Sequence, residues 1–198
     1  MNKPEYVKVN NKKYKINTDF RVAIECNKIA KDGNISDSER PLAIIFKLFG
    51  ETALKEENAK DWQKLLELGL KYLSLNKEIE DVDDEEIDMD FVEDMDYIEA
   101  SFMSDYGIDL SKAKMHWWTF SNLINGLSNS ELGNCCILNR IRNLRTYDLS
   151  QIKDSKERSK LAKAKEAVSL NKNKNKIELT KEQEESMKKL DEIIGFKK

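Results

Sequence analysis

Histidine and cysteine are scarce in this chain of 198 residues. His116 is the only histidine, so a catalytic triad or an imidazole metal site has a single side chain to draw on. The three cysteines are Cys26, Cys135 and Cys136, and the adjacent pair lacks the two-residue spacer of a zinc or redox motif. An odd number of cysteines also argues against a disulfide framework and for a reducing compartment. We therefore expect no metal, no cofactor and no enzymatic activity.

Glycine, proline and long apolar runs are also few. Seven glycines and two prolines disfavour a turn-rich β architecture and tolerate long helices. The longest apolar run, Leu42–Phe46, is far shorter than the ~20 residues that span a bilayer. No apolar stretch follows Met1, so we expect no signal peptide and a soluble, intracellular protein.

Charge is plentiful but unevenly distributed along the chain. Residues 78–111 hold fifteen acids and no Lys or Arg, whereas residues 112–198 hold nineteen basic and eleven acidic residues. Over residues 76–90 the acids are too dense to bury a face, which indicates a solvated acidic linker. A calcium loop is the weaker alternative, because the glycine that its sharp turn needs is missing.

The hydrophobic spacing predicts a mainly α protein, a helical bundle with a small N-terminal β-hairpin. The hairpin turn is expected at Asn10 and Asn11, which accept positive φ readily. We divide the chain into a hairpin with three helices (1–75), the acidic linker (76–90), a helical region (91–170), a flexible linker (171–179) and a C-terminal helix (180–198). Within the helical region, Asp109 or Ser111 is expected to cap a helix that runs to Leu127.

Apolar stripes within the helical region predict its core. One stripe contains Ile98 and Phe102, and the next contains Trp117 and Phe120. Trp118 lies about 100° away from Trp117 on a helix, so the two cannot both be central on one stripe. Either a second covering surface buries Trp118, or Trp118 anchors a protein partner.

Two further groups complete the predicted partner surface. Met115 lies on the same side as Trp118 and joins it as an interaction residue. Arg140, Arg142 and Arg145 begin a basic stripe that continues through the lysines up to Lys165. Since the aromatics that could stack on bases lie elsewhere and the pI is about 5.5, this stripe favours an acidic protein over nucleic acid.

Three segments of the chain resemble one known family. Residues 96–110 read DYIEASFMSDYGIDL, residues 115–120 read MHWWTF, and residues 138–145 read LNRIRNLR. These blocks resemble the bacteriophage gene-product-fifteen family, and the resemblance extends from Asp19 to Val168. Membership implies a gene in the tail module of phages with long non-contractile tails. Such genes usually lie near the tape-measure gene, where tail assembly chaperones are encoded.

The resemblance therefore implies a tail assembly chaperone that binds the tape-measure protein, with the major tail protein as a further partner. It also implies a homo-oligomer that acts in the cytoplasm of the bacterial host and is absent from the mature virion. One alternative is a structural component of the tail or tail tip. A second is a nucleic-acid-associated regulator that uses the basic stripe. We expect neither a membrane nor nucleic acid as partner.

Overall fold

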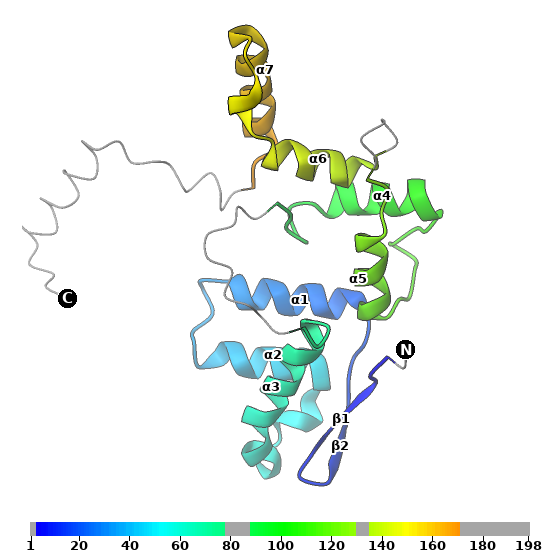
Figure 1. Ribbon diagram of the computed structural model, residues 1–198. Coiled ribbons are helices and arrows are strands. Elements are labelled where there is room, and N and C mark those ends of the chain that lie inside the picture. The colour runs from blue at the N-terminus through cyan, green and yellow to red at the C-terminus, as the bar shows by residue number, and fades with distance from the viewer. Residues whose placement is uncertain (1–2, 78–87, 130–134, 171–198) are drawn as a thin grey trace, which may run out of the picture. The chain divides into compact units, whose positions relative to one another are not determined.

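The computed structural model describes residues 3–77, 88–129 and 135–170 (Figure 1). Within these residues it contains an antiparallel hairpin and seven α-helices, which confirms the mainly α prediction. Most of the predicted acidic linker, the predicted linker 171–179 and the predicted C-terminal helix lie outside the described residues. The described residues fall into two compact units, and each is treated by itself. The first unit contains residues 3–77, 89–129 and 135–143, and the second contains residues 88 and 144–170.

The N-terminal hairpin has the predicted turn. Strand β1 (Tyr6–Val9) pairs with β2 (Lys12–Lys15), and Val9 lies opposite Lys12. Asn10 and Asn11 between the strands have φ of 46° and 64°, the left-handed values that a two-residue hairpin turn requires.

A buried carboxylate fixes this hairpin to the helices. Asp61 is fully buried, and it accepts hydrogen bonds from Asn10 Nδ2 at 2.7 Å and from the Tyr14 hydroxyl at 2.6 Å. These two bonds hold the pKa of Asp61 below its usual value. Burial and the bond to Asp61 raise the pKa of Tyr14 to about 12. Since an isolated hairpin is marginal in water, these side-chain bonds and the burial of Val9 and Ile16 in the core hold it against the helices.

Three helices follow the hairpin. The elements are α1 (Phe20–Lys31), α2 (Glu39–Phe49), the 3-10 turns η1 (Glu51–Leu54) and η2 (Glu56–Asp61), and α3 (Trp62–Leu73). Helix α1 begins after a capping residue, because the Asp19 side chain accepts from the backbone N–H of Arg21. Gly69 of α3 lets that helix approach α2 closely, since a Cβ at this position would lie 2.9 Å from Leu48 Cδ1.

The buried face of α2 differs from the face that the sequence predicts. The hydrophobic spacing placed Leu42, Ile45, Phe46 and Phe49 in the core. Phe46 is instead 47% exposed and Leu42 is half-buried, whereas Ile44 and Leu48 are buried. Helix α2 contacts both α1 and α3, so its buried face is set by two neighbours, and a single stripe does not describe it.

The first unit continues after the acidic run. Its helices are α4 (Met95–Tyr106), α5 (Trp117–Asn125) and α6 (Ile137–Thr146), whose last residues belong to the second unit. Gly107 ends α4 in the left-handed conformation, with φ of 65°. One hydrophobic core includes residues from before and after the acidic run, from Val9 to Leu138.

The structure corrects one end of the predicted acidic linker. Asp90 was assigned to the linker, but it is buried and its Oδ2 lies 2.6 Å from Lys31 Nζ of α1. Its Oδ1 also accepts from the backbone N–H of Val92 at 2.8 Å. Burial opposes ionisation of this carboxyl, but Lys31 and the backbone donors leave the pKa of Asp90 lowered.

The second unit contains the predicted basic helix. After the 3-10 turn η3 (Leu149–Gln151), α7 (Ser155–Ala167) begins where the Asp154 side chain accepts from the backbone N–H of Glu157. No residue of α7 is buried. None of the helices in the described parts of the chain is long and apolar enough to cross a membrane.

Candidate protein-interaction site

The segment before the two tryptophans is extended, and this changes where the helix begins. The backbone N–H of Phe20 donates to Met115 O at 3.0 Å, and that of Trp117 donates to Thr18 O at 2.8 Å. These bonds form an isolated bridge between Asp19 and His116. Helix α5 therefore begins at Trp117, and the predicted cap at Asp109 or Ser111 is wrong. The cap pattern in a sequence involves only neighbouring residues, so it cannot indicate a pairing with a segment almost a hundred residues away.

His116 caps α5, and both of its ring nitrogens contact the backbone. Its Nδ1 accepts from the backbone N–H of Trp118 at 3.1 Å, and its Nε2 lies 3.2 Å from Pro4 O. Because Nδ1 accepts, the proton is on Nε2, which donates to the Pro4 carbonyl. Both ring nitrogens thus join the α5 N-terminus to the segment before β1.

Both tryptophans bind the C-terminal end of α3. Trp117 Nε1 donates to Leu73 O and Trp118 Nε1 donates to Tyr72 O, each at 3.0 Å. The last carbonyls of a helix lack partners inside the helix, so the Trp117 indole supplies one for Leu73 O, and the Trp118 indole adds a second bond to Tyr72 O, which also accepts from the backbone N–H of Leu75 at 3.1 Å. Trp117 is buried, while Trp118 is half-buried and stacks on the Tyr72 ring with centroids 6.1 Å apart.

The predicted core residues meet around Phe120. The Phe120 ring stacks on Phe20 at 4.4 Å and on Phe102 at 5.2 Å between centroids. Trp117 lies 5.9 Å away, and Ile98 is fully buried in the same core. We call residues His116–Phe120 the aromatic block. The block packs segments from both sides of the acidic run.

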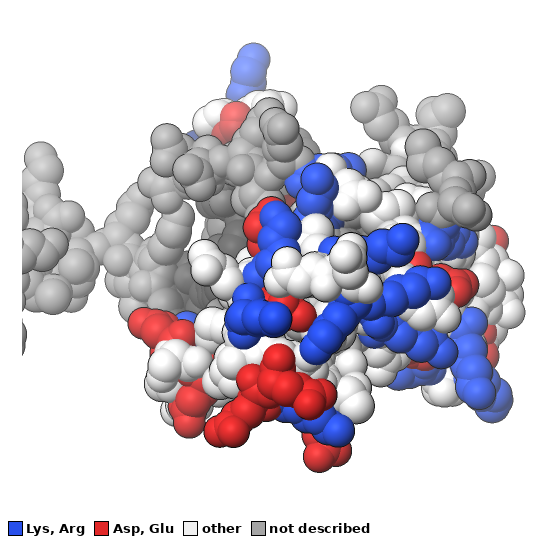
Figure 2. All heavy atoms as spheres, turned by 90° about the horizontal axis from the view of Figure 1, so that it is seen from below, with Lys and Arg blue, Asp and Glu red and all other residues white. Residues whose placement is uncertain are grey.

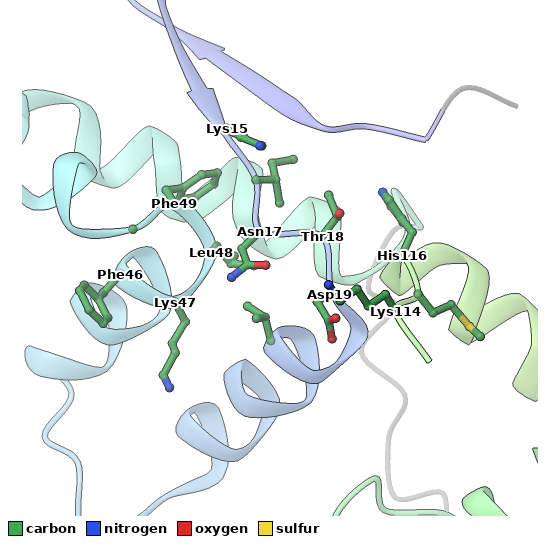
Figure 3. Close-up of a pocket in the computed structure, with 14 residues that line it drawn as sticks. Lys15, Asn17, Thr18, Asp19, Phe46, Lys47, Leu48, Phe49, Lys114 and His116 are labelled. Atoms are coloured by element: carbon green, nitrogen blue, oxygen red, sulfur yellow. The ribbon is translucent and has the colours of Figure 1, made fainter. Parts of the chain in front are cut away.

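An open groove of about 840 Å³ lies beside the aromatic block (Figure 3). Three separate segments line it, and we call it the lysine groove: Lys15–Asp19 with Val22, Phe46–Gly50, and Lys114–His116. Figure 3 shows Phe46 and Lys47 at one end, Lys114 and His116 at the other, and Asn17–Asp19 between them. Three of its lining residues, Ile16, Leu48 and Phe49, are buried and supply an apolar floor.

Lysines with few partners surround this floor. Lys47 Nζ lies 3.6 Å from Glu25 Oε2, whereas Lys15 and Lys114 form no ion pair within the described residues. A neighbouring hollow shares Lys15 and adds Lys12, Lys13 and Lys55. Figure 2, a view from below, shows Lys and Arg adjoining one another over the middle of the face, with Asp and Glu gathered mainly in a separate area. The groove can therefore attract an acidic partner that also presents apolar side chains.

The structure places the sequence-predicted interaction residues in different local surroundings. Met115 lines the groove and is half-buried. Arg140 of α6 is exposed, and Arg142 is half-buried with its Nη1 3.3 Å from Asn139 Oδ1.

Arg145 occupies the interior of the second unit. Its Nε donates to Val168 O at 2.6 Å, and its Nη1 donates to Asp88 O at 2.9 Å. The side chain is buried and bonded within the chain. This placement corrects the prediction that Arg145 faces a partner, because a buried guanidinium bonded to backbone carbonyls is a structural cross-link.

The sequence did not predict the lysine groove, because the residues that line it lie on segments far apart in the chain. Lys15, Lys47 and Lys114 lie on three segments far apart in the sequence, and Phe46 was assigned to the core. Cys26 is buried in the core, and burial raises the pKa of its thiol to about 12. No group of three His, Cys, Asp or Glu residues that could hold a metal occurs in residues 3–77, 88–129 and 135–170.

Comparison with known proteins gives a family match over most of the chain. Residues 2–170 match the family described as Bacteriophage Gp15 protein. The match includes all three segments that line the lysine groove, the aromatic block and α6. Comparisons with curated proteins and with solved structures give no match.

Proposed function

The chain belongs to the family of bacteriophage Gp15 proteins, and on this premise we propose that it is a non-enzymatic tail assembly chaperone. In this proposal it binds the tape-measure protein in the cytoplasm of the bacterial host, self-associates, and is absent from the mature virion. The major tail protein is a further partner. The resemblance of the sequence blocks to the family supplies the gene-neighbourhood argument for these roles.

The lysine groove is the observation that carries the proposal. Tape-measure proteins of such phages are long, helical and partly apolar. An amphipathic helix binds in a groove by placing its apolar face on an apolar floor. Ile16, Leu48 and Phe49 provide such a floor, and Lys15 and Lys114 would face acids at the edges of the helix.

The solvent exposure of these lysines suits a chaperone that is later displaced. Exposed ion pairs contribute only about 0–1 kcal/mol each, so one groove binds one helix weakly. A long partner with many helices can still hold many copies, since each additional contact increases the overall affinity. Weak single contacts also let the polymerising tail tube remove the chaperone step by step.

Coexpression with the tape-measure protein of the same phage tests the proposal. We expect the wild-type chain to raise the solubility of the tape-measure protein and to copurify with it. The double variant Lys15→Glu/Lys114→Glu should lose copurification, because it places acids opposite acids. The matched control Lys153→Glu/Lys160→Glu changes the charge equally on the segment leading into α7 and on α7 itself, and should copurify like the wild type.

Two outcomes would contradict the proposal. One is purification of the chain without any tape-measure protein at several salt concentrations. The other is abundant chain in purified virions by mass spectrometry, which would favour the structural tail component instead.

A further inference from the structure

A second surface of the first unit is complementary to the lysine groove. Val92, Asp96, Glu99 and Met103 follow one another at spacings of four, three and four residues, which places them along one side of α4 and the turn before it. All four are exposed, and the two apolar side chains are strongly so: Val92 is 45% and Met103 is 51% exposed. We call these four residues the α4 stripe. At 1.5 Å per residue it is about 16 Å long.

The chemistry of the α4 stripe mirrors that of the groove. Asp96 and Glu99 form no ion pair with any described residue, as Lys15 and Lys114 form none. Two apolar side chains flank the two acids, while the groove presents Phe46 and an apolar floor between its lysines. The two surfaces therefore carry opposite charges, and each has exposed apolar side chains beside those charges, so they are electrostatically complementary.

The two surfaces do not cover each other within one copy. They share no residue, both belong to the first unit, and the residues of the proposed contact are exposed there: the four of the α4 stripe, and Lys15, Phe46 and Lys114 of the groove. A contact between them therefore requires two molecules.

We infer that the α4 stripe of one copy docks in the lysine groove of a second copy. Asp96 and Glu99 pair with Lys15 and Lys114, while Met103 or Val92 packs beside Phe46. A helix that lays one side in a groove of its partner is a common mode of protein recognition, and here the opposite charges of the two surfaces fix which side of the helix enters. The contact joins two different surfaces, so it either occurs twice in a twofold dimer or links copies head to tail.

The inference deepens the proposed function and rests on it for one consequence. If the tape-measure protein binds the same groove, each helix that binds displaces the α4 stripe of a neighbouring copy. Self-association and partner binding then compete for Lys15 and Lys114. Free chaperone is stored as an oligomer, and the tape-measure protein opens it.

Charge exchange at the two surfaces tests the inference by sedimentation velocity of the full chain over a range of concentrations. We expect the wild type to associate. The variants Asp96→Lys/Glu99→Lys and Lys15→Glu/Lys114→Glu should each weaken association by about 30-fold or more, since like charges then face each other. The quadruple variant exchanges the charges of both surfaces and should associate again. Circular dichroism checks that every variant is folded.

Each other outcome overturns the inference. A monomeric wild type, double variants that associate normally, or a quadruple variant that stays monomeric would each do so. Salt-dependent binding of DNA by a monomeric wild type would assign the groove to nucleic acid. The tape-measure experiment separates this inference from the proposed function: Asp96→Lys/Glu99→Lys keeps the groove and should still copurify with the tape-measure protein.

Discussion

The aromatic block and the lysine groove lie side by side, share His116, and differ in how their polar groups are used. In the block, both ring nitrogens of His116 and both indole N–H groups bond to the backbone of the same chain. In the groove, Lys15 and Lys114 have no ion pair within the described residues, and Phe46 is exposed. The residues that stand out in the sequence thus hold the chain together, whereas the exposed lysines, which do not stand out, form the surface that we propose as the partner site.

The largest expected effect is in the aromatic block. Trp117→Ala should lower the free energy of unfolding by roughly 3–5 kcal/mol, as large truncations in a core do. The substitution removes a buried ring next to Phe91 and Phe120 and leaves Leu73 O without its donor. Denaturant titration followed by circular dichroism measures the loss. A loss below about 1 kcal/mol would mean that the block does not hold the core.

Trp118→Ala should cost less, about 2–3 kcal/mol, from the lost stacking on Tyr72 and the lost hydrogen bond to Tyr72 O. Trp118→Phe keeps an aromatic ring and should lose only about 1 kcal/mol. The same titration measures both variants. If Trp118→Ala leaves stability unchanged and abolishes self-association, Trp118 is the partner anchor that the sequence suggested, and the contrast between block and groove fails.

The position of Lys15 depends on the bond that ties the hairpin to Asp61. Tyr14→Phe removes the hydroxyl that donates to Asp61 and should lower the free energy of unfolding by about 1–2 kcal/mol at pH 7. The pKa of Asp61 is lowered from 3.8, so this carboxylate stabilises the fold above pH 4. That contribution is lost as the pH falls through the lowered pKa. The difference between variant and wild type should therefore shrink below pH 4, and a difference independent of pH would contradict this account.

The smallest expected effect concerns the Tyr72 hydroxyl, one of two buried side-chain atoms that have no hydrogen-bond partner among the residues that the structure describes. The Tyr72 hydroxyl is buried without a hydrogen bond in the structure, and burial raises the pKa of Tyr72. Tyr72→Phe removes an unsatisfied group while keeping the ring under Trp118, so stability should stay equal or rise by up to about 1 kcal/mol. Thermal melting decides this. A fall of 1 kcal/mol or more would show that the hydroxyl has a partner.

Local patterns predicted much of the fold. The Asn10–Asn11 turn depends on near neighbours in the sequence, and it is found where it is predicted; the Asp19 cap and the end of α4 at Gly107 are local features of the same kind. The misses depend on distant partners. Helix α5 begins late because Met115 and Trp117 pair with Thr18 and Phe20. Phe46 is exposed because two other helices set the buried face of α2.

Less of the candidate site than of the fold could be predicted from the sequence. Arg145 has the charge of a surface residue, but Val168 O and Asp88 O hold it in the interior. The lysine groove exists only where three distant segments meet, so no spacing in the sequence could indicate it. Periodicity finds core faces of single helices, and it does not find surfaces made by tertiary contacts.

Copurification with the tape-measure protein, measured for one variant from each region, tests the central claim most directly. The free energy of unfolding of Lys15→Glu/Lys114→Glu should lie within about 0.5 kcal/mol of the wild-type value, because both lysines are exposed. The same variant should no longer copurify with the tape-measure protein. Trp118→Phe should be slightly less stable than the wild type and should still copurify with the tape-measure protein. The reverse pattern, retention by the lysine variant and loss by a folded Trp118→Phe, would contradict the account and return the partner surface to the aromatic block.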